Sequence, residues 1–177
     1  MSTIEIVVLL AATVGLLYLN WEFSIKARRF HGVYRFFSFE SILILVLLNW
    51  RIWFFDPFSW NQIISWILLV GSIPIAVEGF RLLRIVGKPQ GQFENTTKLV
   101  TIGLYRYIRH PLYASLILVG LGVFFKQVSP LGTVLAFVNL GAMIATAKTE
   151  EKEMVRTFGI EYELYMRQTK MFIPFII

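Results

Sequence analysis

Apolar residues along the chain gather into five long runs, and short polar segments separate them. The runs are Ile4–Leu19, Phe37–Phe55, Trp60–Phe80, Pro111–Phe125 and Leu131–Ala147. A helix needs about 20 apolar residues to cross the hydrocarbon core of a bilayer, and most of these runs approach that length. The pattern therefore predicts an all-α integral membrane protein with about five transmembrane helices.

The fourth run is the shortest of the five. As a helix, Pro111–Phe125 would be roughly 22 Å long, whereas a hydrocarbon core is about 30 Å thick. Either His110 lies below the level of the headgroups or the bilayer thins at this point. Both alternatives predict that the helix begins in a recess open to water and to lipid.

The chain becomes more polar after the fifth run. A polar stretch, Lys148–Glu153, is expected to continue the fifth helix out of the membrane, until Phe158 and Gly159 interrupt it. Ile160–Lys170 then has the pattern of an amphipathic helix on the membrane surface. The apolar segment Met171–Ile177 is expected to return to the interface.

Charge predicts the orientation of these helices. The chain has 17 Lys and Arg residues against 11 Asp and Glu residues, a net charge of +6. The basic residues stand beside the apolar runs, as in Lys26, Arg28, Arg29, His31 and Arg35 after the first run. Cytoplasmic loops carry such residues, so we expect the N-terminus outside and the C-terminus in the cytoplasm. Contact with anionic lipid explains the charge, and no nucleic-acid partner is expected.

Composition narrows the possible chemistry. The 177 residues contain no cysteine and two histidines, so neither a thiol nucleophile nor a metal site is expected. The length fits a single membrane domain, with three spans in residues 1–86 and the functional region in residues 87–177. Gly87–Thr97 has the glycine, proline and polar residues of a loop, and is a candidate mobile flap.

Charged residues inside the runs are few. Glu40 is expected near the inner end of the second run and Arg51 near its outer end, where long side chains can reach the interface. Glu78 is expected to pair with Arg81 one helical turn away. On this interpretation no acidic residue lies near mid-depth, which argues against a transporter.

The stretch from Lys98 to Tyr113 carries the densest chemistry. Pro111 suits the first position of a helix, which leaves the N–H groups of Leu112, Tyr113 and Ala114 at the positive end of the helix dipole. Arg109 adds a forked cation beside them. This helix end is therefore a candidate anion site, in particular for a carboxylate.

The short turn after the fourth run makes the fourth and fifth runs an antiparallel hairpin. Their inner ends must then be neighbours, which brings Arg109, His110 and Tyr113 beside Glu150 and Glu151. Cations facing carboxylates suit a zwitterion such as an amino acid group, and a carboxylate also binds a ribose diol. The alternative is that these Glu residues only balance neighbouring lysines.

Aromatic residues beside the proposed site favour a ligand with a flat or cationic group. Tyr105, Tyr107 and Tyr113 are candidates to cover an adenine or a sulfonium. Lys98 and Arg106 are equally well explained as anchors at the membrane surface. The residues alone therefore suggest a zwitterionic, nucleoside-like ligand and do not single one out.

An ordered set of motifs supports a more specific hypothesis. The set comprises Lys98-Leu99-Val100, Gly103-Leu104-Tyr105, Arg109-His110-Pro111-Leu112-Tyr113, Glu150-Glu151, the FGIEYELY sequence Phe158–Tyr165, and Pro174. It resembles the membrane-integral methyltransferases that include protein isoprenylcysteine carboxyl methyltransferase and the phospholipid N-methyltransferases. The resemblance covers about residues 98–177.

The resemblance implies an S-adenosylmethionine site, with S-adenosylhomocysteine as the product, and a lipophilic or lipidated acceptor that enters laterally from the bilayer. The implied cofactor-binding residues are Lys98, Leu99, Val100, Tyr105, Arg109, His110, Pro111, Tyr113, Glu150 and Glu151. Glu150 and Arg109 are the candidate catalytic residues, and Tyr162 and Tyr165 would close the site. Thr146 departs from the pattern, since the prenylcysteine enzymes have an arginine there, so an amine, phenol or other lipid is at least as suitable an acceptor.

Two other functions remain open at this point. Sterol reductases have a distantly similar C-terminal hairpin, and Lys88, Lys98, Arg106 and Arg109 leave open a nicotinamide-dependent membrane reductase. A membrane scaffold or transport component would use the same charges for orientation alone. Such a protein would keep its function when Glu150 is changed to Gln.

Overall fold

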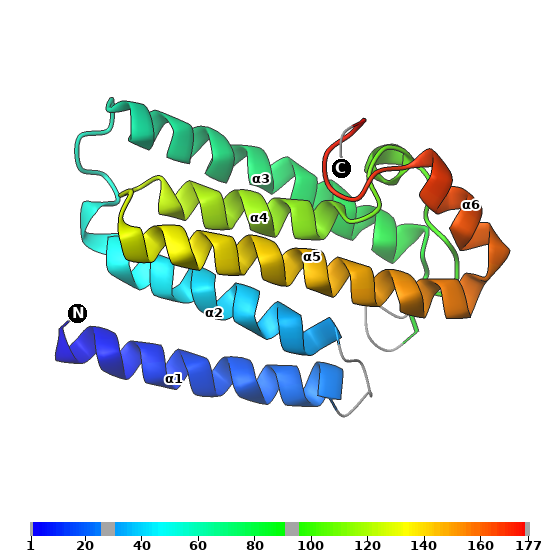
Figure 1. Cartoon of the computed structure of the whole chain (residues 1–177), viewed down its shortest axis with the longest axis horizontal. Helices are drawn as coiled ribbons and strands as arrows, with labels where there is room; N and C mark the ends of the chain where they lie inside the picture. The colour runs from blue at the N-terminus through cyan, green and yellow to red at the C-terminus, as the bar shows by residue number, and fades with distance from the viewer. Residues whose placement is uncertain (1, 26–30, 91–95, 176–177) are drawn as a thin grey trace. The chain divides into compact units, whose positions relative to one another are not determined.

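The computed structural model describes residues 2–25, 31–90 and 96–175, and this part of the chain is helical (Figure 1). The six α-helices that it contains are α1 (Thr3–Asn20), α2 (His31–Asn49), α3 (Trp60–Ile85), α4 (Pro111–Phe124), α5 (Pro130–Phe158) and α6 (Ile160–Gln168). Lys26, Arg28, Arg29 and the middle of the predicted flap, residues 91–95, lie outside the described residues. The predicted all-α architecture is confirmed.

Four of these helices have the length and composition of membrane spans. They are α1, α2 with the following 3₁₀ turn η2 (Trp50–Ile52), α3 and α5. α4 has 14 residues and is shorter, about 21 Å, as the fourth apolar run predicted. The chain is therefore a membrane protein, whereas the predicted fifth crossing and the orientation of the helices stay predictions.

The chain folds into two compact units, and each combines two separate stretches of sequence. The first unit contains Met1–Val70 and Ile117–Thr146, and the second contains Gly71–Leu116 and Ala147–Ile177. Helices α3, α4 and α5 each contribute to both units. The membrane anchor α1–α2 belongs to the first unit, and the predicted site residues belong to the second.

Polar contacts attach α1 to α2 within the first unit, where the two helices lie side by side (Figure 1). Glu5 forms a capping box with Ser2 at the start of α1. Its carboxylate also accepts a hydrogen bond from Trp50 Nε1 at 3.0 Å and pairs with Arg51 at 2.8 Å. Arg51 was expected to reach the interface, and its largely exposed side chain pairs there with Glu5.

α2 begins six residues earlier than the apolar pattern predicted, at His31 instead of Phe37. The polar residues of this first turn find partners inside the protein, since His31 is buried and Arg35 donates to Ser24 Oγ at 3.1 Å. Glu40 is therefore at the midpoint of α2. The expectation that Glu40 lies near the end of its helix is wrong, whereas its depth in the membrane stays a prediction.

Polar side chains also connect α2 to α5 in the first unit. Asn139, the buried polar residue of α5, donates to Ser38 Oγ at 2.7 Å. A Cβ atom on Gly120 would come within 2.4 Å of Asn139 Oδ1, so α4 can approach α5 this closely only with glycine at position 120. Such hydrogen bonds hold spanning helices together where lipid cannot supply a partner.

The turn between α4 and α5 contains a buried lysine. Lys126 is 1% exposed, and its ammonium group donates to Gln62 Oε1 at 2.9 Å and lies 3.6 Å from the centre of the Trp66 ring. Burial lowers the pKa of Lys126. The backbone carbonyl of Lys126 accepts hydrogen bonds from Asn61 and Gln62, so α3 holds this turn through both side chain and backbone.

We expect Gln62→Leu to lower the unfolding temperature, because the Lys126 ammonium would lose its oxygen acceptor. Leaving a buried polar group unpaired costs about 1–3 kcal/mol. Thermal unfolding followed by circular dichroism in detergent micelles measures the effect. Gln127→Leu, at the exposed neighbouring position, is the control. Equal unfolding temperatures for the two variants would show that the aromatic rings alone stabilise Lys126.

Candidate active site

The loop that leads to the site is anchored on α3 within the second unit. A 3₁₀ turn, η3 (Gly103–Arg106), begins at Gly103, whose φ of 60° favours glycine. Tyr105 on this turn is buried against Leu82 and Val100. Its hydroxyl donates to the carbonyl of Gly79 at 3.4 Å. These contacts fix the path of the chain just before the Arg109–His110 pair.

α4 begins at Pro111, as the sequence predicted. The carbonyl of His110 accepts the first helical hydrogen bond, from the N–H of Ala114 at 2.9 Å. The expectation that the N–H of Ala114 is open to an anion is therefore wrong. Pro111 and Leu112 pack closely on α3, since a Cβ on Gly79 would lie 3.2–3.3 Å from their side chains.

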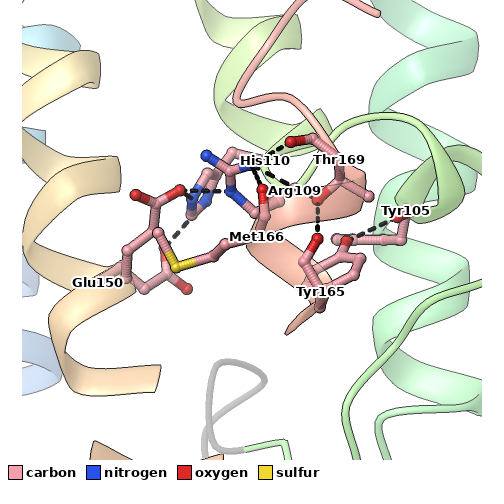
Figure 2. A network of polar contacts seen from close by, with 8 residues as sticks. Tyr105, Arg109, His110, Glu150, Tyr165, Met166 and Thr169 are labelled. Atoms are coloured by element: carbon pink, nitrogen blue, oxygen red, sulfur yellow. Dashed lines mark hydrogen bonds and ion pairs between the residues drawn. The ribbon is translucent and has the colours of Figure 1, made fainter. Parts of the chain in front are cut away.

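Arg109 is the centre of a network that joins three segments of the second unit (Figure 2). Its Nε donates to Glu151 Oε1 on α5 at 2.6 Å. Its Nη1 donates to two backbone carbonyls at the end of α6, that of Thr169 at 2.5 Å and that of Met166 at 3.2 Å. Arg109 thus binds α5 and the C-terminal segment at once.

His110 lies between the two carboxylates of α5. Its Nδ1 is 3.5 Å from Glu150 Oε2, and its Nε2 is 3.3 Å from Glu151 Oε1. The imidazole is buried and stacks on the Tyr113 ring, with ring centres 5.3 Å apart and planes 12° apart. The structure confirms the predicted proximity of Arg109, His110 and Tyr113 to Glu150 and Glu151.

This arrangement favours the charged form of His110. A neutral imidazole has one N–H donor, whereas the imidazolium has two, and here each ring nitrogen faces a carboxylate. Burial acts to lower the pKa of His110, but the hydrogen bonds and negative charges of Glu150 and Glu151 together outweigh it and raise the pKa. With Arg109 included, two cations balance two carboxylates.

The C-terminal segment pairs with the chain just before α4. Arg109 N–H donates to the carbonyl of Lys170 at 2.8 Å, and His110 N–H donates to that of Met171 at 3.1 Å. Lys170 N–H in turn donates to the carbonyl of Tyr107 at 3.1 Å. Sequence analysis missed this pairing and expected Met171–Ile177 only to return to the interface. Its donors and acceptors are backbone groups, which leave no side-chain pattern.

α6 closes the second unit with two buried tyrosines, as its amphipathic pattern predicted. Gly159, with φ 58°, separates α5 from α6. Tyr165 donates its hydroxyl to the carbonyl of Tyr105 at 2.6 Å. Burial raises the pKa of Tyr162 and of Tyr165. Both phenols are therefore neutral, and that of Tyr165 serves as a hydrogen-bond donor.

The remaining predicted site residues lie in different surroundings. Lys98 is exposed and Val100 is buried in the packing around Tyr105. Leu99 lines a cavity of about 250 Å³ in the second unit. The other residues that line it are Thr101, Arg106, Glu161, Leu164, Tyr165, Gln168 and Thr169. The assignment of all these residues to a cofactor stays a prediction.

Two other residues singled out in the sequence behave as local structure. Glu78 pairs with Arg81 at 3.1 Å, which confirms the predicted pairing. Thr146, at the position where the prenylcysteine enzymes were expected to have an arginine, is buried and donates to the carbonyl of Ala142 at 2.7 Å. A hydroxyl bonded to its own helix does not supply the cation that the motif would place there.

Comparisons with known proteins identify relatives of this chain. The sequence model of the phospholipid methyltransferase family matches residues 60–161, more than half of the chain. A methanethiol S-methyltransferase of Crocosphaera subtropica is 33% identical over 152 residues, which cover 78% of this chain and 59% of that protein. A probable protein-S-isoprenylcysteine O-methyltransferase of Oryza sativa is 33% identical over 85 residues, 48% of this chain and 44% of that protein. The chain thus spans about half the length of these relatives.

The raised pKa of His110 predicts how stability depends on pH. The imidazolium stabilises the folded state fully below the ordinary pKa of about 6.5, and this contribution is lost as pH rises through the raised folded value. We therefore expect the unfolding temperature to fall with rising pH above neutrality. In Glu150→Gln the fall begins at lower pH, because one of the two carboxylates that raise the pKa is gone. Unfolding temperatures across a pH series measure both effects.

The second histidine of the chain provides the control for this experiment. His31→Gln should keep the alkaline fall, whereas His110→Gln should remove it. A pH profile that is the same in wild type and His110→Gln would contradict a charged His110.

Proposed function

The chain belongs to the phospholipid methyltransferase family, and we propose that it transfers a methyl group from S-adenosylmethionine to a lipophilic acceptor dissolved in the membrane. The observation that carries this proposal is the meeting of Arg109 and His110 with Glu150 and Glu151 in the second unit. Relatives that are themselves named methyltransferases support the reaction type and favour it over a reductase.

The charges of this cluster suit the amino acid end of the cofactor. Arg109 and His110 would attract its carboxylate, and Glu150 would accept from its ammonium group or its ribose diol. S-adenosylmethionine supplies an activated methyl group on a sulfonium. The protein then has to align the acceptor, exclude water and take up a proton where the acceptor has one.

The two carboxylates are proposed to have different tasks. The side chain of Glu151 is 9% exposed and is held by Arg109 and His110, so it fixes their positions. The side chain of Glu150 is 21% exposed and lies farther from His110, which suits contact with cofactor or acceptor. We assign proton uptake from the acceptor to Glu150 and positioning to Glu151.

The acceptor is proposed to be a small or lipidated lipophilic molecule. The relative named for methanethiol and the relatives named for isoprenylcysteine act, by these names, on sulfur and on oxygen. Thr146 places no cation beside Glu150, which argues against an acceptor carboxylate as the preferred group. A thiol, amine or hydroxyl on an apolar body fits better.

We further propose that the site faces the cytoplasm, with the N-terminus on the opposite side. The exposed cations of the second unit and the positive-inside tendency support this orientation. Labelling of single cysteines introduced at Lys98 and at Phe58 of otherwise cysteine-free protein, in sealed vesicles, tests it. Reaction of both positions from the same side would contradict the orientation.

Cofactor binding tests the proposal directly. We expect wild-type protein to bind S-adenosylhomocysteine in isothermal titration calorimetry, and His110→Ala to bind roughly 10- to 100-fold more weakly. The affinity falls because His110 positions both glutamates and supplies positive charge, and a 10- to 100-fold change corresponds to about 1.4–2.8 kcal/mol. His31→Ala is the matched control, and should bind as wild type does. Absence of binding to folded wild-type protein would overturn the cofactor assignment.

Activity separates the two glutamates. With labelled S-adenosylmethionine and a panel of an alkanethiol, an alkylamine and a prenylated cysteine, Glu150→Gln should lower kcat by about 10²–10⁴ while it still folds, because the base is lost. Glu151→Gln should lower the unfolding temperature and cofactor affinity together. Glu163→Gln, an exposed position on α6, is the control. Full activity of Glu150→Gln would refute its assignment.

A further inference from the structure

Glu40 on α2 has an unusual position for a carboxyl group. It lies at the midpoint of a helix that is long and apolar enough to cross the membrane. Thr13, its partner, lies near the middle of α1. At this depth the hydrocarbon core supplies no water, so each polar group needs a partner within the protein or from a molecule in the bilayer. Ionisable residues at such depth are expensive and mark functional sites.

One half of this carboxyl group is satisfied and the other is not. Glu40 Oε1 accepts a hydrogen bond from Thr13 Oγ1 at 2.7 Å. Glu40 Oε2 is buried and has no hydrogen-bond partner among the residues that the structure describes. An unpaired buried acceptor costs more than an ordinary hydrogen bond returns, so a donor at Oε2 would stabilise this carboxyl group.

The surroundings of Glu40 indicate where a donor would come from. α1 packs against α2, and much of its surface is exposed and apolar, with Leu10 61% and Val14 65% exposed. A molecule that reaches Glu40 between these helices must therefore enter from the lipid. It needs an apolar chain for the bilayer and one donor group for the carboxyl.

We infer that Glu40 and Thr13 form an intramembrane binding site for a lipid-soluble molecule that carries an O–H or N–H donor on an apolar chain. The donor group binds Glu40 Oε2, while Thr13 keeps Oε1 occupied and holds the carboxyl in place. Oε2 is shielded in this structure, so the ligand enters by parting α1 from α2. This site belongs to the first unit and does not depend on the proposed methyl transfer.

Photolabelling of the full chain in lipid nanodiscs tests the inference. Three probes of equal chain length carry a diazirine near the head group, which is an alcohol, a primary amine or a methyl ether. The ether has no donor. We expect the alcohol and the amine to label peptides of α1 and α2 about tenfold more than the ether does, as one buried hydrogen bond predicts. Equal labelling by all three probes would overturn the site.

Two variants distinguish a binding site from a structural contact. Glu40→Gln replaces a carboxyl oxygen with an amide donor, so labelling by the alcohol should fall to the level of the ether. Thr13→Val removes the internal donor and leaves Glu40 with two open acceptors, so labelling should stay or rise. If the contact only attaches α1 to α2, both variants would lower stability and leave labelling equally unchanged or equally reduced, which would overturn the inference.

Controls keep the experiment decisive. Glu78→Gln, a carboxylate of the second unit paired with Arg81, should leave labelling of α1 and α2 unchanged. Thermal unfolding of each variant checks that it is folded. If Glu40→Gln does not fold, the Thr13→Val result decides alone. Reduced alcohol labelling in folded Thr13→Val contradicts the site, and retained or increased labelling supports it.

Discussion

The second unit depends on a buried balance of charge. Glu151 on α5 is acceptable inside the protein because Arg109 and His110 neutralise it, and backbone carbonyls at the end of α6 accept hydrogen bonds from Arg109 Nη1. Breaking a buried pair leaves an uncompensated charge, which costs about 3–5 kcal/mol. The start of α4, the C-terminal part of α5 and the C-terminal segment must therefore come together, and each requires the other two.

This balance has a consequence for binding. A cluster that already neutralises itself can take up a zwitterion without any change in net charge, because a carboxylate adds to the cations and an ammonium group adds to the acids. The backbone pairing of Lys170 and Met171 with Tyr107, Arg109 and His110 holds the cations from behind. The side chains are then oriented before a ligand arrives, which lowers the entropy that binding must overcome.

The lengths of the apolar runs predicted the spanning helices. The antiparallel pairing of the fourth and fifth runs predicted which residues meet at the site. Both predictions depend on side chains, which the sequence gives directly. Two features of the structure could not be predicted from the sequence, for physical reasons. The early start of α2 depends on buried partners for His31 and Arg35, which an apolar pattern does not register. The C-terminal pairing uses backbone groups, which every residue has, so neither its existence nor its register could be predicted from residue types.

The two units solve the problem of buried polar groups in different ways, and the contrast isolates Glu40. The second unit pairs oppositely charged side chains near helix ends. Besides the ion pair of Glu5 with Arg51, the first uses neutral hydrogen bonds, as between Asn139 and Ser38, and gives Lys126 an amide oxygen and an aromatic ring near its turn. Glu40 Oε2, like Ser65 Oγ, has no hydrogen-bond partner among the described residues. A carboxyl group loses more free energy than a hydroxyl when it lies unpaired in an apolar interior, and a donor from the bilayer supplies the partner that Glu40 lacks.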